Sequence, residues 1–412
     1  MSPIIHRLLA LSEKPARVVV GLISGTSADS ISVAICRIRG GGVAMPGSPG
    51  ATVELICYYE HPYASSVRRL VFGAAKLDVR TIAELHVQVG ELFAEACLNA
   101  IQAAKLTTEE IDLIGSHGQT LYHHSSMPGV PRATLQVGDG DQIAERTGIC
   151  VVSDFRARDI AAGGEGAPLT PYSDLILYAD PVGLATNRRR VILNLGGIAN
   201  VTVLDPDPNH VFGFDTGPAN SLLDRLAFQL SGGELTCDLD GRLARSGTVN
   251  AVLLEDLLKS DPFLKRRPPK STGFEMYGDA FLERAAVAHG RRDHDLMATL
   301  TEFTARSIAM ALEHFVADPT VGEIIVAGGG SRNPALMERI RANMSPVPVR
   351  DSEEVGVSSS AREAMAFALF ANEALLGHPT SLPSVTGART PVILGKWSFP
   401  SASPATLTIT LP

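Results

Sequence analysis

The chain has 412 residues, of which 45% are hydrophobic and 19% are charged, and its formal net charge is -8. The length favours two or three domains, and the composition is that of an ordinary soluble globular protein. The acidic balance argues against the basic surface that nucleic acids and anionic membranes require, so small molecules are the expected partners.

Five widely spaced cysteines lack the spacing of metal ligands, which indicates free thiols in a reducing compartment. No apolar run reaches the roughly 18 residues of a transmembrane helix, and residues 1–14 contain no signal-peptide cleavage site. We therefore expect a cytoplasmic protein with no membrane or nucleic-acid partner.

The first half of the chain begins with a hairpin. Residues 17–36 contain two β-branched runs joined by a small-residue turn at residues 24–29. Residues 52–59 are expected to form a third strand, residues 81–104 an amphipathic helix, and residues 111–115 a short buried strand. The expected order is three antiparallel strands, a helix and a strand.

The same order begins again in the second half. Residues 190–204 predict a second hairpin, and residues 210–214 predict a third strand. Helices are expected at residues 219–230 and 297–316, followed by a strand at residues 323–327. Strands that alternate with helices around glycine-rich turns predict an α/β fold with two domains flanking a nucleotide cleft.

The domain boundary is expected in the polar connection near residues 180–189. We place an N-terminal domain at residues 1–188 and a C-terminal domain at residues 189–412. The C-terminal domain carries an insertion at residues 231–270, and the last segment of the chain is free to pack back on the N-terminal domain.

The turn of the first hairpin is a candidate phosphate site. The turn leaves backbone amides and hydroxyls free to face a ligand, and no bulky side chain blocks its approach at Ser24, Gly25, Thr26 and Ser27. The turn lacks the lysine of a P-loop, and an ordinary tight hairpin is the simpler explanation when it is taken alone. Asp29 is a candidate Mg²⁺ ligand, with an aspartate that bonds its own backbone as the alternative.

The turn of the second hairpin, Gly196 and Gly197, is the counterpart of the first. Two such turns, one in each half, indicate a duplicated architecture with a nucleotide between the halves. A third glycine-rich turn, Gly328, Gly329 and Gly330, follows a strand.

A helix follows this third turn, with Asn333 as its expected N-cap and Pro334 at its first position. Three consecutive glycines allow a flat adenine or ribose to lie against the backbone. A tight strand–helix turn requires only one or two glycines, so the pattern favours a ligand.

Asp215 is the candidate general base. It is expected at the end of a strand and just before a helix, which is where ligands bind to α/β sheets. An ordinary aspartate has a pKa of about 3.9 and is ionised at neutral pH. The alternative is that Asp215 caps the following helix.

Residues 154–168 alternate carboxylates and guanidiniums beside a glycine-rich bend. Such a set suits sugar hydroxyls and a carboxylate, with a solvated ion-pair network as the alternative. The candidate substrate ligands here are Asp154, Arg156, Arg158 and Asp159.

His117 and Gln119 follow a buried strand in an expected loop, where polar side chains often bind ligands. We assign both to the substrate, with a structural histidine as the alternative for His117, and we give His117 no catalytic role. Glu363 stands at the capping-box spacing from Ser360, which explains it as a helix-start residue. The alternative for Glu363 is a metal or water ligand.

Taken together, these segments resemble the anhydro-N-acetylmuramic acid kinase family of the actin and hexokinase superfamily. Seven motifs occur in family order between about residues 18 and 397. They lie at residues 21–29, 116–120, 154–169, 194–200, 213–218, 269–273 and 327–330.

The resemblance implies two actin-like, ribonuclease H-like domains that bind ATP, Mg²⁺ and an anhydro sugar. It implies a kinase in which water opens the 1,6-anhydro bond while the 6-oxygen takes the γ-phosphate of ATP. In this reading Asp215 is the base, the two hairpin turns face the phosphates, and the triple glycine lies beside the nucleoside. Glu363 and Asp29 are metal-site residues, Asn333 joins the ATP ligands, and Asn200 joins the substrate ligands.

Two positions depart from the family pattern. Ser30 and Ser32 stand where the family has glycine and aspartate, which changes the charge around the first hairpin. Levoglucosan kinase, a related enzyme acting on anhydroglucose, is an alternative, as are an ordinary hexose kinase and a non-catalytic sugar or nucleotide sensor. Peptidoglycan recycling is the implied process, and a homodimer is compatible with the sequence.

Overall fold

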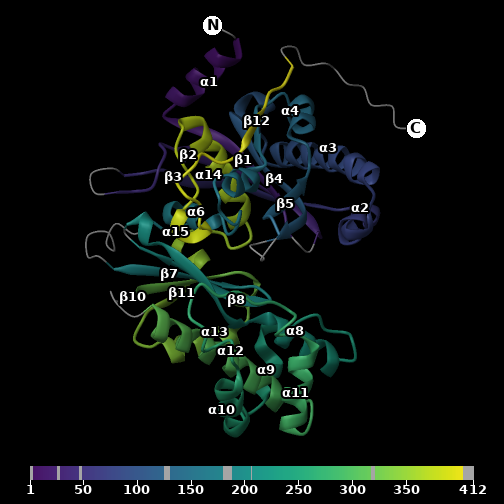
Figure 1. Cartoon of the computed structure of the whole chain (residues 1–412), viewed down its shortest axis with the longest axis vertical. Coiled ribbons are helices and arrows are strands. Elements are labelled where there is room, and N and C mark those ends of the chain that lie inside the picture. Colours follow the sequence, from purple (N-terminus) through teal and green to yellow (C-terminus); the bar gives the residue numbers. More distant parts are fainter. Residues whose placement is uncertain are drawn as a thin grey trace. The chain divides into compact units, whose positions relative to one another are not determined.

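The computed structural model describes residues 3–25, 28–45, 49–124, 130–179, 188–205, 207–316 and 321–401 (Figure 1). The chain divides into two compact units: unit 1 comprises Met1–Ala179 and Ser360–Pro412, and unit 2 comprises Asp180–Ser359. Residues 360–412 thus group with the first half of the chain, which the sequence analysis allowed only for the last segment. Most of the expected polar connection between the halves lies outside the described residues.

Unit 1 is an α/β unit. Its strands are β1 (Ala16–Ser24), β2 (Ser30–Arg39), β3 (Thr52–Pro62), β4 (Leu113–His124), β5 (Ala133–Val137), β6 (Val151–Ser153) and β12 (Lys396–Ser398). Its α-helices are α1 (Pro3–Glu13), α2 (Ser65–Phe72), α3 (Val79–Ala103), α4 (Gly140–Thr147), α5 (Phe155–Ala161), α6 (Thr170–Leu177), α14 (Arg362–Leu376) and α15 (Pro383–Thr386).

The sheet of unit 1 has the strand order β12-β6-β4-β1-β2-β3, with β5 paired to the second half of β4. Strands β1, β2 and β3 form an antiparallel meander, whereas β4 is parallel to β1 and β6 is parallel to β4. Asp78 is the N-cap of helix α3, and its carboxylate accepts a hydrogen bond from the Thr81 amide. The meander, helix and parallel strand confirm the order predicted for the first half.

Unit 2 repeats this plan. Its strands are β7 (Arg189–Leu195), β8 (Ile198–Leu204), β9 (Phe212–Pro218), β10 (Val321–Ala327) and β11 (Val349–Asp351). Its α-helices are α8 (Asn220–Leu230), α9 (Arg242–Ser246), α10 (Ala251–Ser260), α11 (Asp279–His289), α12 (His294–Phe315) and α13 (Pro334–Met344). The segment expected to be an insertion contains α9 and α10.

The sheet of unit 2 has the order β11-β10-β7-β8-β9. An antiparallel meander of β7, β8 and β9 is again followed by strands that run parallel to its first member. Corresponding strands therefore occupy corresponding places in the two sheets, which is the duplicated α/β architecture that the two hairpins predicted.

Two expectations about strand ends were wrong. Strand β4 continues to His124, so His117 and Gln119 lie within a strand and not in a loop. Strand β9 continues to Pro218, so Asp215 lies within a strand and not at its end. In both cases polar and glycine residues suggest a strand end, whereas the strand pairing resumes beyond a local shift in register.

The backbone of α14 lies directly on the sheet of unit 1. A Cβ atom at Gly21 would stand 1.8 Å from the Ala364 carbonyl oxygen, and one at Gly115 would stand 2.0 Å from the Phe367 carbonyl oxygen. Val20 and Leu22, the neighbours of Gly21 in β1, are fully buried in the core that includes Phe93 of α3. Figure 1 shows α14, in yellow, beside the purple and blue strands of this unit.

All five cysteines are free thiols, as predicted. Burial raises the pKa of the Cys36 and Cys97 thiols to about 12, so both are protonated and unreactive at neutral pH. Among the described helices, none combines the length and the apolar character needed to cross a bilayer.

The contact at Gly21 yields a stability prediction. Gly21→Ala inserts a methyl group into a space that a backbone carbonyl occupies, so it should destabilise the fold by about 1–3 kcal/mol. Thermal unfolding followed by circular dichroism measures the effect. The control is Gly329→Ala, where a Cβ atom meets no other atom within 4 Å. Equal melting temperatures for the two variants would contradict the contact.

Candidate functional site

The first hairpin of unit 1 is held by a glutamine on β4. Ser24 ends β1 with only 2% of its surface exposed, and Gln119 is fully buried beside it in the parallel register of β1 and β4. The Gln119 amide donates to the carbonyl oxygen of Gly25 at 3.2 Å. Gln119 therefore fixes the start of the predicted phosphate turn. Thr26 and Ser27, which continue that turn, lie outside the described residues.

On the neighbouring strand β4, two buried polar atoms beside this turn have no hydrogen-bond partner among the described residues. They are the side-chain carbonyl oxygen of Gln119 and the hydroxyl of Ser116, which is paired in register with Leu22 of β1. Buried polar groups without partners are rare and often mark the place of a water, ion or ligand. Both atoms are oxygens, the ligand type that Mg²⁺ and its water shell prefer.

Asp29 is engaged elsewhere. Its carboxylate pairs with the Arg68 guanidinium at 2.5 Å, and its side chain is 58% exposed. This ion pair takes up the negative charge that the sequence analysis assigned to a metal. Asp29 is therefore a weaker candidate for a metal ligand than the sequence suggested.

Arg156, which is half-buried, and His117, which is buried, form a hydrogen-bonded pair in unit 1. The Arg156 Nε donates to His117 Nε2 at 2.8 Å, and Arg156 Nη1 donates to the Gly166 carbonyl oxygen at 2.8 Å. His117 Nδ1 donates to the Gly118 carbonyl oxygen at 3.0 Å, since its other ring nitrogen is the acceptor. The imidazole also contacts the Phe367 ring at a tilt of 43°, with ring centroids 4.7 Å apart.

Both ring nitrogens of His117 are thus used within the chain. Burial and the nearby Arg156 charge lower the pKa of His117 to about 3, so it is neutral at physiological pH. The geometry assigns His117 to the orientation of Arg156, which corrects its assignment to the substrate. Burial likewise lowers the pKa of Arg156, whereas the charge of Glu363 raises it.

Glu363 lies in the first turn of α14 and is exposed. The capping-box explanation for it was wrong, because the N-cap of α14 is Ala361 and no side chain caps the helix. The residue that fixes this turn is Arg362, which makes a buried bidentate pair with Asp174 at 2.9 and 2.5 Å. Glu363 itself has no hydrogen bond or ion pair to another described residue, so its carboxylate is available to a cation.

Three other predicted substrate residues lie in different surroundings. Asp159 is fully buried, and its carboxylate accepts hydrogen bonds from the Gly166 amide and the Thr386 hydroxyl, both at 2.8 Å. It therefore holds the glycine-rich bend in place, which corrects its assignment to a sugar. Asp154 pairs with Lys396, and Arg158 is exposed on α5. Of the charged set, Arg156 keeps the strongest case for ligand binding.

In unit 2 the second hairpin turn is fastened to the start of α8. The carbonyl oxygen of Gly196 accepts from the Asn220 amide at 3.0 Å and from the Asn220 side chain at 2.9 Å. The carbonyl oxygen of Gly197 accepts from the Ala219 amide at 2.9 Å. These bonds hold the carbonyl groups toward α8, and Asn220 is a positioning residue that the sequence analysis did not identify.

The triple glycine lies next to this hairpin. A Cβ atom at Gly328, where φ is +86°, would stand 2.8 Å from the Leu195 carbonyl oxygen, and one at Gly330 would stand 2.6 Å from the Leu195 side chain. Gly329 has open space around it. Asn333 caps α13 as predicted, accepting from the Leu336 amide at 3.2 Å. Two of the three glycines are thus explained by packing, and the open position at Gly329 is the one suited to a ligand.

Asp215 is held by the segment before α11. Its backbone amide donates to the Lys270 carbonyl oxygen at 3.1 Å, and its carboxylate accepts from the Thr272 amide at 2.8 Å. Asn200 is its cross-strand partner on β8, beside a bulge. The N-cap of α8 is Ala219, so the explanation of Asp215 as a helix cap was wrong.

The environment of Asp215 raises the pKa of its carboxyl. Desolvation is the largest cause, and the Thr272 amide, the Ser271 hydroxyl and the Lys270 charge oppose it. The sequence analysis assumed an ordinary aspartate, whereas a raised pKa gives a stronger base that is closer to neutral pH. The hydroxyl of Thr272 is buried without a partner in the described part of the chain. The 269–273 motif matches the family pattern, but nothing in its sequence indicates a contact with Asp215.

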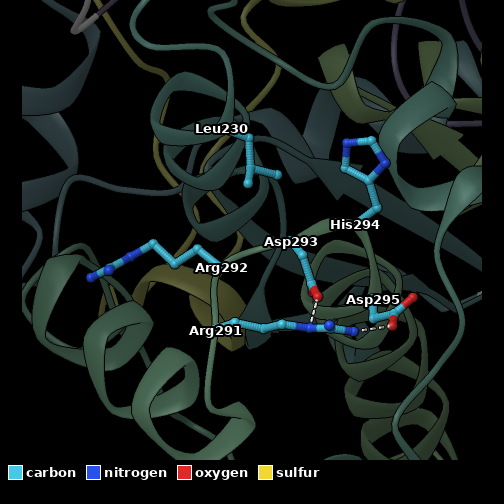
Figure 2. A pocket seen from close by; sticks show the side chains of 6 residues that line it. All are labelled: Leu230, Arg291, Arg292, Asp293, His294 and Asp295. Carbon is cyan, nitrogen blue, oxygen red and sulfur yellow. Dashed lines mark hydrogen bonds and ion pairs between the residues drawn. The ribbon is translucent and has the colours of Figure 1, made fainter.

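A second group of possible metal ligands already has partners within the chain. His289, Asp293 and Asp295 lie close together around the start of α12. Figure 2 shows Asp293 and Asp295 directed at the guanidinium of Arg291, which pairs with both. Asp293 also accepts from the Leu296 amide at 2.9 Å as the N-cap of α12. These contacts explain the cluster as a helix start.

The His117 environment predicts an acid-sensitive stability. The unfolded chain binds a proton at His117 near pH 6.5 and the folded chain only near pH 3, so folding stability rises with pH between these values. His117 alone should therefore lower the unfolding free energy by about 1.6 kcal/mol between pH 6.5 and pH 5. Urea unfolding at both pH values should show a smaller loss for His117→Gln than for the unmodified protein. The control is His6→Gln, which replaces an exposed histidine. If His117→Gln lost as much unfolding free energy as the unmodified protein, the buried neutral state of His117 would be contradicted.

Comparison with known proteins gives one consistent family. The profile of the anhydro-N-acetylmuramic acid kinase family matches residues 17–400. An anhydro-N-acetylmuramic acid kinase of Caldanaerobacter subterraneus is 42% identical over 95% of this chain and 100% of its own length. Proteins of the same name from Salinibacter ruber and Bacillus cereus are 39% and 38% identical, over 95% and 93% of this chain and 99% of their own lengths.

Among solved structures, the likeness is weaker. A ROK family glucokinase from Streptomyces griseus in complex with glucose and AMPPNP has a TM-score of 0.35 and 12% identity, over 86% of this chain and 99% of that one. A likeness of this size adds nothing to the sequence match. The match over most of the chain and the full-length relatives show that this chain belongs to the anhydro-N-acetylmuramic acid kinase family.

Proposed function

We propose that this protein is an ATP-dependent kinase acting on 1,6-anhydro-N-acetylmuramic acid. Water opens the 1,6-anhydro ring, the 6-oxygen takes the γ-phosphoryl group of ATP, and the products are N-acetylmuramic acid 6-phosphate and ADP. The relatives named for this substrate support it over levoglucosan, a simple hexose or a sensor role. The structural observation that carries the proposal is the half-buried Asp215 carboxylate, held by a backbone amide and more basic than usual.

In the proposed mechanism, Asp215 accepts a proton from the attacking water. The water oxygen forms a bond to the anomeric carbon while the bond from that carbon to the bridging 6-oxygen breaks. The 6-oxygen then holds the electron pair that attacks the γ-phosphorus, and ADP leaves. The Thr272 amide fixes the direction of the carboxylate, which would hold it in place to accept the proton.

Unit 1 supplies groups that suit phosphate and metal. Arg156 is charged, half-buried and oriented by His117, which favours contact with phosphate or carboxylate oxygens. Gln119 fixes the turn at Gly25 and has an unpartnered oxygen. We propose that the site uses Mg²⁺, which would neutralise phosphate charge, with Glu363 as its protein ligand directly or through water.

The remaining expectations stay predictions. These are a cytoplasmic location, the assignment of the two compact units to two actin-like domains, and a homodimer. Peptidoglycan recycling follows from the proposed substrate, because that sugar is a fragment of the bacterial wall.

The role of Asp215 predicts both a loss of rate and a pH dependence. Asp215→Asn removes the base and should lower kcat for 1,6-anhydro-N-acetylmuramic acid by about 100-fold or more while the protein stays folded. In the unmodified protein, kcat/KM should fall as the pH falls through the Asp215 pKa, which burial raises above its ordinary value. Coupled ADP release measured from pH 4.5 to 8 tests both.

The control for this variant is Asp256→Asn, an exposed aspartate on α10 that should keep full activity. Near-normal turnover by Asp215→Asn would remove Asp215 from the mechanism. Absence of ADP release with the anhydro sugar in the unmodified protein would reject the kinase proposal itself.

The proposed metal role of Glu363 is tested through the magnesium requirement. Glu363→Gln keeps the shape of the side chain but removes its charge, so half-maximal activity should need about 10-fold more Mg²⁺. The control is Glu338→Gln on the exposed face of α13. An unchanged Mg²⁺ dependence in Glu363→Gln would show that this carboxylate does not serve the metal.

A further inference from the structure

Lys270 carries a buried ammonium group beside the proposed base. Only 8% of its surface is exposed. Its Nζ atom lies over three aromatic rings, 4.6 Å from the centre of Phe263, 5.0 Å from Phe315 and 5.9 Å from Phe214. It also points to the carbonyl oxygens of Phe263 at 3.3 Å and Leu264 at 3.5 Å. The ring faces and carbonyl groups both favour a positive charge at this place.

No carboxylate pairs directly with this ammonium within the described part of the chain. A buried lysine without a contacting counter-ion is costly, and an apolar side chain of similar length would fill the same space more favourably. Burial accordingly lowers the pKa of Lys270. A charge retained at such a place calls for an explanation beyond packing.

Three charged groups face Lys270. Asp261 and Asp215 favour its charged form, and Arg266 opposes it. The Asp261 carboxylate is occupied by the Tyr277 hydroxyl at 2.7 Å and the Phe263 amide at 2.8 Å. Asp215 is the other carboxylate, and its own surroundings also include Glu275.

The main chain connects Lys270 to Asp215 as well. Lys270 accepts a hydrogen bond from the Asp215 amide, and two residues later the Thr272 amide donates to the Asp215 carboxylate. The segment from Lys270 to Thr272 therefore lies along β9 and hydrogen-bonds both the backbone amide and the carboxylate of Asp215. Anchoring the Lys270 side chain among rings from β9, α12 and the loop after α10 fixes this segment.

We propose that Lys270 is a positioning residue for the reaction, one that anchors the 270–272 segment against β9 and stabilises the negative charge of Asp215 from the protein side. This role rests on the proposed function of Asp215 as the base. Burial favours the protonated, inactive form of Asp215, and the Lys270 charge opposes that effect. The lysine thus keeps a desolvated base ionised under working conditions.

The direct test is the pKa of Asp215 itself. The protein is labelled with ¹³C at the aspartate carboxyl carbons, and the Asp215 signal is identified by its absence from Asp215→Asn. In Lys270→Met the Asp215 pKa should rise by about 0.5 to 1 unit, less than the 1–3 units typical of charges in contact. The acid limb of kcat/KM should move to higher pH by the same amount.

The matched control is Arg266→Met, which removes an exposed positive charge from the same loop and should leave the Asp215 pKa unchanged. Lys270→Met could also leave Asp261 buried without its positive neighbour and impair folding. The double variant Lys270→Met/Asp261→Asn removes both charges. Its new side-chain carbonyl oxygen accepts from the Phe263 amide and its NH2 group donates to the Tyr277 hydroxyl, so it provides a second folded protein with the same expected shift.

A folded Lys270 variant with an unshifted Asp215 pKa would overturn the proposal and leave Lys270 as a packing residue. The carboxyl titration needs no turnover, so this outcome is distinct from failure of the proposed kinase activity. An Asp215 pKa that shifts in a protein inactive on the anhydro sugar would support the electrostatic coupling and reject the substrate.

Discussion

The contact of the α14 backbone with β1 and β4 is the constraint on which unit 1 depends. Gly21 and Gly115 have no Cβ, so the carbonyl groups of Ala364 and Phe367 lie where side chains would otherwise be. This contact brings a C-terminal helix onto an N-terminal sheet, and the Arg362–Asp174 pair fixes the start of that helix. Glu363, Phe367 and the His117–Arg156 pair are positioned as a consequence.

Unit 2 holds its proposed base by a different device. A side chain on a strand is normally held only by the strand itself. Asp215 is held in addition by two hydrogen bonds to the main chain of residues 270–272. Desolvation makes the carboxylate a stronger base, and amide, hydroxyl and lysine together limit that effect. The balance of these opposing contributions sets the pH range in which the residue can accept a proton.

Local patterns predicted what depends on local physics. The β-branched runs around small-residue turns indicated both hairpins, helical periodicity indicated α3 and α12, and the sequence Asn333-Pro334 indicated the cap of α13. The sequence could not indicate that no side chain caps the helix carrying Glu363. Nor could it indicate that Asp159 is buried under a glycine bend or that Asp29 pairs with Arg68. Each of these depends on a partner brought near by tertiary folding, as does the contact of Lys270 and Thr272 with Asp215, more than fifty positions away in the chain.

The central claim, that water attacks the anomeric carbon while the sugar 6-oxygen takes the phosphoryl group, is tested most directly in ¹⁸O-labelled water. A single turnover with ATP, Mg²⁺ and 1,6-anhydro-N-acetylmuramic acid is stopped quickly and the products are analysed by mass spectrometry, with unlabelled product in labelled water as the exchange control. The account predicts one ¹⁸O at the anomeric hydroxyl of the sugar phosphate and none in its phosphoryl group. Label in released inorganic phosphate, or a sugar phosphate without ¹⁸O, would contradict it.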